Sequence, residues 1–373
     1  MITKYTPFKN IPPGEFIKEE LEERDWSQED LAEVMGVSPK TVSKLINNLQ
    51  AITPEIARLL SKAFDQPLNY WLNLYNNYIL RELEKKNNTN EVTKKSYIYS
   101  HMPVREMVKK KWIKLCGDVE ELENEVLKFF NWEKLNFDLY KEHLPLFRKS
   151  EAYSQYNEYN ALVWYSMAKK MAKHYNKINP YNKDTLLSLS KELHKFTISS
   201  NGVKEFIQCL NDAGVIFFVL SHLNKTYIDG ASFYDNENPV IVYSKRYDRI
   251  DNFWFVIAHE ISHIIKNLEK KEDYYSINFD LNKVPRQKEI EKEADEFALE
   301  VVKEKEIIEF FKDKTYKTHH SILEAEKKLQ ICAGIIVGIL QHTGLTSRKN
   351  FNEYKYKIND LIPDKYYTEK ILK

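Results

Sequence analysis

The sequence is poor in cysteine and glycine and has no long apolar run, and each absence excludes a class of protein. Its three cysteines, Cys116, Cys209 and Cys332, lie far apart, so neither a Cys-x-x-Cys metal pair nor a disulfide framework is indicated. Nine glycines and a hydrophobic share of 43% are typical of a globular chain rather than a fibrous or disordered one. The longest apolar run, residues 335–340, is far short of the roughly 20 residues that span a bilayer, and no secretory signal begins the sequence. We therefore expect a soluble, cytoplasmic protein with no membrane partner.

The sequence also lacks an excess of charge of either sign. Its 56 Lys and Arg residues balance 55 Asp and Glu residues, which leaves a net charge of +1 and no field that would draw the whole chain to nucleic acid. Any contact with DNA must therefore come from a local surface. At 373 residues the chain exceeds an ordinary domain of about 100 to 200 residues, so two or three folded units are expected.

Periodicity divides the chain into four segments, namely 1–84, 85–199, 200–345 and 346–373. Apolar residues recur at helical spacing in the first segment, which predicts an all-α domain. The second segment begins with a polar stretch, 85–96, that predicts a surface linker or long turn before a helical connector. The fourth segment is left as a C-terminal tail.

The third segment changes from helical to mixed patterning. Short β-branched and aromatic runs at 214–220 and 239–243 predict strands of a small sheet. Predicted helices follow at 250–268, 286–304, 306–312, 321–330 and 333–342. Residues 200–345 are therefore expected to form an α+β domain.

Two short helices joined by a turn are predicted near the N-terminus. Ser27 is expected to cap the first helix, Gly36 supplies the turn, and Ser38 caps the second. In a helix-turn-helix the second helix meets base edges in the major groove, so Lys40 and Lys44 are candidates to read bases. The residues placed to contact phosphates are Gln28, Ser38, Thr41 and Asn47, with Ser43 on the same face but without an assigned role.

The alternative interpretation of this region is a helical bundle that does not bind DNA. Residues 1–80 hold 8 Lys or Arg against 11 Asp or Glu, so the domain as a whole is acidic. DNA binding therefore requires that positive charge gather on one face, and we expect the affinity to be modest and sensitive to salt.

Five motifs extend the pattern beyond the two helices: GEFIKEEL at 14–21, WSQEDLA at 26–32, GVS at 36–38, AITP at 51–54 and YWLNL at 70–74. Together they resemble the HigA-type antitoxin branch of the Xre repressors over nearly all of residues 12–80. The resemblance implies a homodimer on a palindromic, double-stranded operator DNA and a toxin as protein partner. Pro39 stands where many relatives carry a long polar side chain, so base recognition at that position is not implied.

A His-Glu-x-x-His motif lies near residue 260. His259 and His263 are four residues apart, hence on one helical face, with Glu260 beside them. The apolar flanks would bury both imidazoles, and a zinc ion would satisfy their nitrogens. A purely structural histidine pair is the alternative. A catalytic zinc takes a third protein ligand, and Glu293 is the semi-buried carboxylate of an amphipathic helix at 289–298.

The remaining acidic residues of that helix, Glu289, Glu291 and Glu296, are interpreted as a solvated face, and without the resemblance described next Glu293 could equally belong to that face. Further motifs are Ala-Gly-Val at 213–215, Asp-Gly-Ala at 229–231, Pro-Val-Ile-Val at 239–242, Phe-x-x-Ala-His-Glu at 255–260 and Glu-Ala-Asp-x-Phe-Ala at 293–298. They resemble the ImmA/IrrE metallopeptidase family over residues 200–345. In that family the glutamate before Ala-Asn/Asp is the third zinc ligand, which implies Glu293 here.

The segment 333–342 is similar to a Pro-Gly-Ile-Val-Val-Gly-Arg-Leu-Gln-His segment of fused HigA/ImmA-like regulators, from which Ala333 and Ile339 depart. The sequence thus predicts a multi-domain protein: an all-α helix-turn-helix domain, a helical connector and an α+β zincin-like metallopeptidase domain. With Zn²⁺ bound, Glu260 would act as the general base. Oxyanion stabilisers are available by type among Tyr274, Tyr275, His319 and His320, and the sequence does not choose between them.

Two functions are open on this evidence. The chain could be a regulator whose endopeptidase domain cleaves a repressor, a toxin or another partner protein. It could instead be an antitoxin and autorepressor whose zinc domain serves structure or sensing. A weaker interpretation takes a lysine-rich run as a second nucleic-acid surface: Lys94, Lys95, Arg105, Lys109, Lys110, Lys111 and Lys114.

Overall fold

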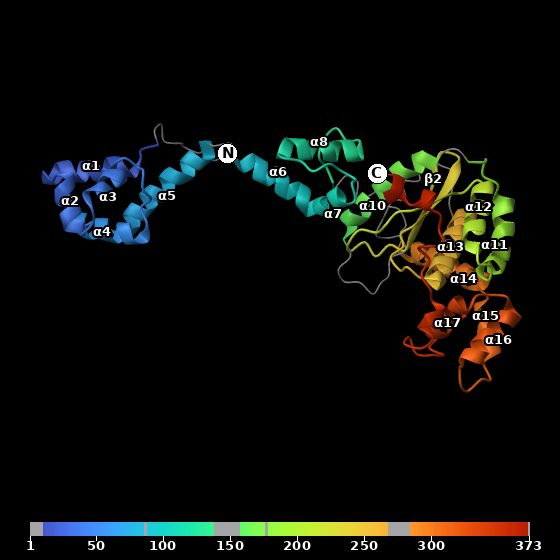
Figure 1. Cartoon of the computed structure of the whole chain (residues 1–373). Coiled ribbons are helices and arrows are strands. Elements are labelled where there is room, and N and C mark those ends of the chain that lie inside the picture. Colours follow the sequence, from blue (N-terminus) through green and yellow to red (C-terminus); the bar gives the residue numbers. More distant parts are fainter. Residues whose placement is uncertain (1–9, 86–87, 138–156, 176–177, 268–283, 372–373) are drawn as a thin grey trace. The chain divides into compact units, whose positions relative to one another are not determined.

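The computed structural model describes residues 10–85, 88–137, 157–175, 178–267 and 284–371. The chain divides into two units, Met1–Tyr97 and Ile98–Lys373, which are described separately (Figure 1). Unit 1 is helical, and unit 2 combines helices with a small sheet, so the predicted multi-domain architecture is confirmed. In the described ranges, no helix is long and apolar enough to cross a membrane.

Unit 1 consists of a series of short helices: α1 (Pro13–Arg24), α2 (Gln28–Met35), α3 (Pro39–Ile46), α4 (Pro54–Phe64) and α5 (Leu68–Lys85). Side-chain caps fix where three of them begin, because Ser27, Ser38 and Thr53 each accept a hydrogen bond from the backbone N–H three residues on. The core between the helices is fully apolar, and its most buried members include Ile17, Leu31, Val42, Leu60 and Trp71.

Gly14 allows α1 to approach the end of α3. A Cβ at this position would lie 2.0 Å from the carbonyl oxygen of Ile46, so no other residue fits without a backbone shift. The N–H of Gly14 donates to Oδ1 of Asn48 at 2.9 Å, which joins the same two segments. Close packing here therefore sets the position of the helix that is predicted to contact DNA.

The predicted linker at 85–96 differs from the structure, which places most of it in α6 (Asn88–His101). The stretch contains no glycine or proline, and the helix ends in a packed region where Ile98 and Met102 are buried. Tertiary contacts thus overrode the weak helix propensity of a polar segment. Further helices follow in unit 2: α7 (Val104–Lys109), α8 (Val119–Phe130), α10 (Glu158–Ala172), α11 (Lys183–Thr197) and α12 (Gly202–Asp212), with a 3₁₀ turn, η1 (Lys173–Tyr175), after α10.

A three-stranded sheet lies at the centre of unit 2, formed by β1 (Ile216–Val219), β2 (Gly230–Asp235) and β3 (Asn238–Tyr243). The strand order is β1-β3-β2, with β1 parallel and β2 antiparallel to β3. The predicted strands correspond to β1 and β3. The sequence did not predict β2, because Gly, Ala and Ser at its start have low strand propensity.

Helices cover both faces of the sheet. Successive strand residues point to opposite faces, so Phe233 and Gly230 of β2 face different helices. Phe233 contacts Tyr165 of α10, with ring centroids 5.3 Å apart. Gly230 lies against Val256 of α13 (Ile250–Ser262), where a Cβ would be only 2.6 Å from Cγ1 of that valine. The His-Glu-x-x-His helix is thus held directly against the sheet.

The remaining helices complete unit 2. The chain after α13 continues as a π-helical turn, η2 (His263–Asn267). It is followed by α14 (Val284–Val301), α15 (Glu304–Phe311), α16 (His319–Leu329) and α17 (Ala333–His342), coloured orange to red in Figure 1. The last elements are two 3₁₀ turns, η5 (Asn352–Tyr354) and η6 (Asp364–Tyr366), and the short α18 (Thr368–Ile371).

The predicted C-terminal tail, 346–373, is an integral part of unit 2 in its described residues. Ile358 and Tyr366 belong to the same core as the sheet. Lys355 is buried, and its Nζ lies 3.0 Å from Oδ2 of Asp251 in the first turn of α13 and 2.6 Å from Oε1 of Gln341. This buried ion pair connects the C-terminal segment to α13, the helix that carries the two histidines.

Candidate metal centre and candidate DNA-contact helix

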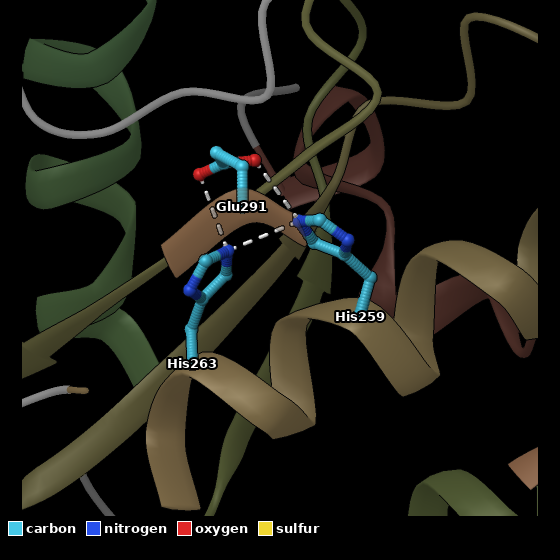
Figure 2. Close-up of side chains that lie close together, drawn as sticks. All are labelled: His259, His263 and Glu291. Atoms are coloured by element: carbon cyan, nitrogen blue, oxygen red, sulfur yellow. Dashed lines mark hydrogen bonds and ion pairs between the residues drawn. The ribbon is translucent and has the colours of Figure 1, made fainter. Parts of the chain in front are cut away.

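Three side chains that can bind a metal converge between α13 and α14 (Figure 2). The Nε2 atoms of His259 and His263 are 3.0 Å apart. Glu291 of α14 places Oε2 3.4 Å from Nε2 of His259 and Oε1 3.5 Å from Nε2 of His263. One ligand atom from each residue lies within 4.8 Å of the others. The two His nitrogens and the carboxylate therefore face a common point.

The partner of His259 on its other side determines which nitrogen carries the proton. Nδ1 of His259 lies 2.9 Å from Oδ1 of Asp295, and a carboxylate can only accept, so Nδ1 is the donor. The Nε2 atom of the neutral ring then presents a lone pair to His263 and Glu291. A lone pair that faces a carboxylate is unfavourable unless a cation lies between them.

A buried acceptor atom also favours a cation between these side chains. Among the described residues, Oε1 of Glu291 has no hydrogen-bond donor although it is buried. His259 is 1% and His263 7% exposed, so water does not solvate these groups freely. Two imidazoles and one carboxylate form a donor set that suits zinc, and the residues present fit this ion. The π-helical turn that begins at His263 is a distortion often found at functional sites.

His259, His263 and Glu291 together are called the candidate metal-binding group. Glu260 lies next to this group but does not belong to it. Its Oε2 accepts a hydrogen bond of 2.7 Å from Oγ of Ser232 on β2. A Cβ on Gly230 would lie 2.9 Å from Oε1 of Glu260, so the glycine leaves room for the carboxylate. Two residues of the unpredicted strand β2 therefore orient the group that was predicted to be the general base.

Glu291, and not the predicted ligand Glu293, is the carboxylate that lies with the two histidines in the structure. Residues of a helix advance by about 100° each, so Glu291, Ala294 and Asp295 share one face while Glu293 points away from it. Ala294 is fully buried against α13, whereas Glu293 is exposed. The small residues at 294 and 298 were the signal that could have identified this face, because alanine permits close helix packing.

Of the four oxyanion candidates, the two that the structure describes, His319 and His320, do not join this group. Tyr274 and Tyr275 lie outside the described residues. His319 and His320 are exposed at the start of α16, and Nδ1 of His319 lies 3.1 Å from the hydroxyl of Tyr354 instead.

In unit 1, α3 presents the predicted DNA contacts on its outer face. Oγ of Ser38 accepts from the N–H of Thr41 at 3.2 Å, which fixes the start of the helix. Lys40 and Lys44 are exposed and lie one turn apart, and Thr41 beside them is half-buried. The opposite face of α3 is buried through Val42, Leu45 and Ile46.

The other predicted contacts border this face. Gln28 is the exposed first residue of α2, and Ser43 is half-buried on α3. Nδ2 of Asn47 donates to the backbone carbonyl of Ser43 at 2.8 Å, so part of this amide caps the C-terminal end of α3. Six of the seven predicted residues thus lie on α3 or at its two ends, and Gln28 lies on the preceding helix, α2.

The lysine-rich run does not form a uniform solvated surface. Lys110 donates to Oγ of Ser221, which follows β1, and lies 4.0 Å from the carboxylate of Glu369. Burial lowers the pKa of Lys110, with the charge of Glu369 opposing that shift. This lysine joins α7 to the sheet and is not available to nucleic acid.

Two known families match separate parts of the chain. The helix-turn-helix family matches residues 17–71, and the IrrE N-terminal-like domain family matches residues 216–354. The second match includes the sheet, α13 and α14, and hence every residue of the metal-binding group.

Curated relatives resemble about a fifth of the chain. The HTH-type transcriptional regulator YddM of Escherichia coli (strain K12) is 40% identical over 73 residues, which are 20% of this chain and 78% of YddM. The HTH-type transcriptional regulator YbaQ of the same strain is 39% identical over 84 residues, which are 22% of this chain and 74% of YbaQ.

Two solved structures were also matched. The Pseudomonas aeruginosa antitoxin HigA with the higBA promoter is 31% identical, with 22% of this chain and 90% of that chain covered and a TM-score of 0.21. An addiction module antidote protein of the HigA family from Coxiella burnetii is 30% identical, with 23% and 95% covered and a TM-score of 0.22.

Proposed function

Because this chain belongs to the Xre-type helix-turn-helix regulators and carries an IrrE-like domain, we propose that it is a DNA-binding regulator with a zinc-dependent endopeptidase unit. The endopeptidase cleaves a partner protein that takes part in regulation, such as a repressor or a toxin. The helix-turn-helix brings the protein to its operator, and cleavage of the partner changes transcription there.

The observation that carries this proposal is a carboxylate that lies beside three candidate zinc ligands and is not itself one of them. A catalytic zinc uses three protein ligands and keeps one position for water, whereas a purely structural zinc uses four. His259, His263 and Glu291 would hold the ion, which would polarise the scissile carbonyl and acidify the water. Glu260 is left over, adjacent to the ligands and oriented by Ser232.

The role of Glu260 follows from its position. A carboxylate next to the attacking water takes its proton and later delivers that proton to the leaving amine. Ser232 stabilises the ionised form, because its hydroxyl donates to the carboxylate oxygen. Loss of a general base typically costs about 10²- to 10⁴-fold in rate.

For DNA binding, Lys40 and Lys44 meet base edges in the major groove of a double-stranded operator. Gln28, Ser38, Thr41 and Asn47 hold phosphates, and Ser43 completes the contact face. Regulators of this kind bind palindromic sites as homodimers, and we extend that arrangement to this chain.

The test is an affinity capture from native cells with wild-type protein and Glu260→Gln side by side. The variant keeps all three ligands and loses the base, so it should hold intact a protein that the wild type cuts. Glu293→Gln is the matched control, because it removes the same charge from an exposed position and should cut like wild type. A captured partner that stays uncut by all three proteins would refute proteolysis.

One observation favours a second function, that of a non-proteolytic antitoxin and autorepressor. Glu260 is only 3% exposed, as expected if the zinc site serves structure or sensing. In that case Glu260→Gln should neutralise the cognate toxin as well as wild type does, and no cleavage product should form.

A further inference from the structure

A polar cavity of about 290 Å³ lies beside the sheet, where the chain leaves β1 and β3. These two strands are parallel, so their carboxyl ends share one edge of the sheet. Tyr367 pairs with Val219, the last residue of β1, and Lys245 follows the end of β3 by two residues. Both Tyr367 and Lys245 line the cavity. Ligands of open sheets commonly bind outside the carboxyl ends of parallel strands, and a cavity of this volume suits a small molecule.

The charged groups of the cavity differ in whether they are already paired. Two lysines and three carboxylates line it. Three of these five groups lie in ion pairs, namely Asp364 with Lys370 and Glu369 with Lys110 of α7. In the described part of the chain, the other two, Lys245 and Asp360, have no ion-pair partner. One cation and one anion of the cavity are therefore left for a ligand.

The side chain of Asn359 connects these two charges. Nζ of Lys245 donates to Oδ1 of Asn359 at 2.6 Å, and Nδ2 of Asn359 donates to Oδ1 of Asp360 at 3.3 Å. An ammonium carries three donors and a carboxylate about four acceptor sites, so both groups keep the capacity for further hydrogen bonds. A cation and an anion are thus held on either side of one amide group. A ligand with a carboxylate at one end and an ammonium at the other matches this order of charges.

Tyr367 provides a fixed aromatic wall. It is 7% exposed, its hydroxyl donates to the backbone carbonyl of Asn359 at 2.9 Å, and its ring lies 5.2 Å from Nζ of Lys245. Burial, and then the charges of Asp248 and Asp360, raise the pKa of this hydroxyl, so it stays a neutral donor. Lys245 itself has a φ of 53°, in the left-handed region that costs energy for a residue with a side chain. Residues held in such conformations often lie at ligand sites.

We propose that this cavity binds a small zwitterion, a molecule that carries both an ammonium and a carboxylate, as free amino acids and short peptides do. Lys245 binds the carboxylate of the ligand and Asp360 binds its ammonium, each through charge-assisted hydrogen bonds. The ring of Tyr367 packs against the carbon atoms of the ligand. The cavity shares no residue with the candidate metal-binding group, so the inference depends neither on zinc nor on the proposed peptidase.

The experiment is a saturation-transfer difference NMR titration of the full-length protein with glycine, diglycine and triglycine. At least one of these probes should bind, and the probe with the lowest Kd gives the length of the ligand, which distinguishes an amino acid from a peptide. Two capped forms of that probe test its charges, because the N-acetyl form lacks the ammonium and the amide form lacks the carboxylate. Each should bind about 10- to 100-fold more weakly than the uncapped probe, as expected for the loss of a hydrogen bond between charged groups.

Substitutions in the cavity test where the probe binds. Lys245→Met and Asp360→Asn each remove one charge and nearly keep the size of the side chain, so each should weaken binding by a similar factor. Asp360 is exposed, so its substitution remains a valid test even if Lys245→Met lowers stability. The matched controls, Lys357→Met and Asp313→Asn, change exposed residues outside the cavity and should bind like wild type. Wild type that binds no probe, a capped form that binds as tightly as the uncapped one, or undiminished binding by both cavity variants would overturn the inference.

Discussion

In unit 1 most of the predicted DNA-contacting residues lie on α3 or at its ends, exposed or half-buried, and the start of that helix is fixed by a local cap from Ser38 to Thr41. In unit 2 the side chains of the candidate metal site come from α13 and α14, are largely buried, and depend on how those helices pack. A surface that recognises DNA is therefore specified by a short stretch of sequence. The candidate metal centre also needs the tertiary fold, because its carboxylate comes from a second helix, and changes far from it in sequence can disturb it.

Zinc removal should have the largest difference in effect between the two units. A ligand that binds only the folded state stabilises it by about 4 kcal/mol when its free concentration is about 1,000 times Kd. A strong chelator should therefore lower the unfolding temperature of unit 2 and leave binding of operator DNA at its original affinity. His263→Ala should show no response to zinc or chelator. Loss of DNA binding on chelation would show that the two regions are coupled.

Gly14→Ala should destabilise unit 1 and leave unit 2 unaffected. The new Cβ would meet the carbonyl oxygen of Ile46 at 2.0 Å, so α1 and α3 must separate, at a cost of about 3 kcal/mol in the free energy of unfolding. Gly36→Ala is the control, because nothing lies within 4 Å of its Cβ and only the positive φ of 65° costs about 1 kcal/mol. Denaturant unfolding measures both, and zinc content should stay unchanged in each.

Lys40→Ala and Lys44→Ala should weaken DNA binding without affecting zinc. If these side chains contact bases, each change should cost about 1–3 kcal/mol and relax the preference for the operator. If one contacts only phosphate, it should weaken all sequences equally and reduce the salt slope by about 1. Lys62→Ala, an exposed lysine of α4, serves as the control. Fluorescence anisotropy at several salt concentrations distinguishes these outcomes, and unaltered binding by both variants would exclude α3 as the contact helix.

The smallest predicted effect concerns Lys169, on the face of α10 toward the sheet. Burial lowers the pKa of Lys169 to about 8, with the charge of Asp235 opposing that shift. In the unfolded chain a lysine titrates near pH 10.4, so between about pH 8 and 10 the unfolded state binds more protons than the folded one. The free energy of unfolding should therefore rise with pH in that window, by about 1 kcal/mol between pH 7 and 9.

Lys169→Met should remove this rise. Denaturant unfolding at pH 7, 8 and 9 measures it, and Lys204→Met, a change at an exposed lysine of α12, should keep the wild-type slope. A variant at Lys169 with the same slope as wild type would contradict the assigned pKa.

The parts of the fold and site that could be predicted are those encoded locally. The caps of unit 1 act over three residues, and the two histidines share a helix face by their spacing. Which of Glu291 and Glu293 faces the two histidines depends on the rotation of α14 about its axis against α13. A sequence motif does not specify that rotation. The contact between Asp295 and His259 depends on the same packing.

Non-local pairing explains the other differences. β2 is a strand because it pairs with β3, although its first residues favour turns. The C-terminal segment joins unit 2 through the buried pair of Lys355 and Asp251, two residues that are distant in sequence. Local sequence does not predict pairings of this kind, because they depend on the positions of both segments in the folded structure.

The measurement that most directly tests the zinc site is the metal content of Glu291→Ala and Glu293→Ala, purified together with wild type. Wild type and Glu293→Ala should each contain one zinc per chain, and Glu291→Ala should lose it, because only Glu291 faces the two histidines. Retention of zinc by Glu291→Ala with loss in Glu293→Ala would contradict the geometry on which the proposed function rests.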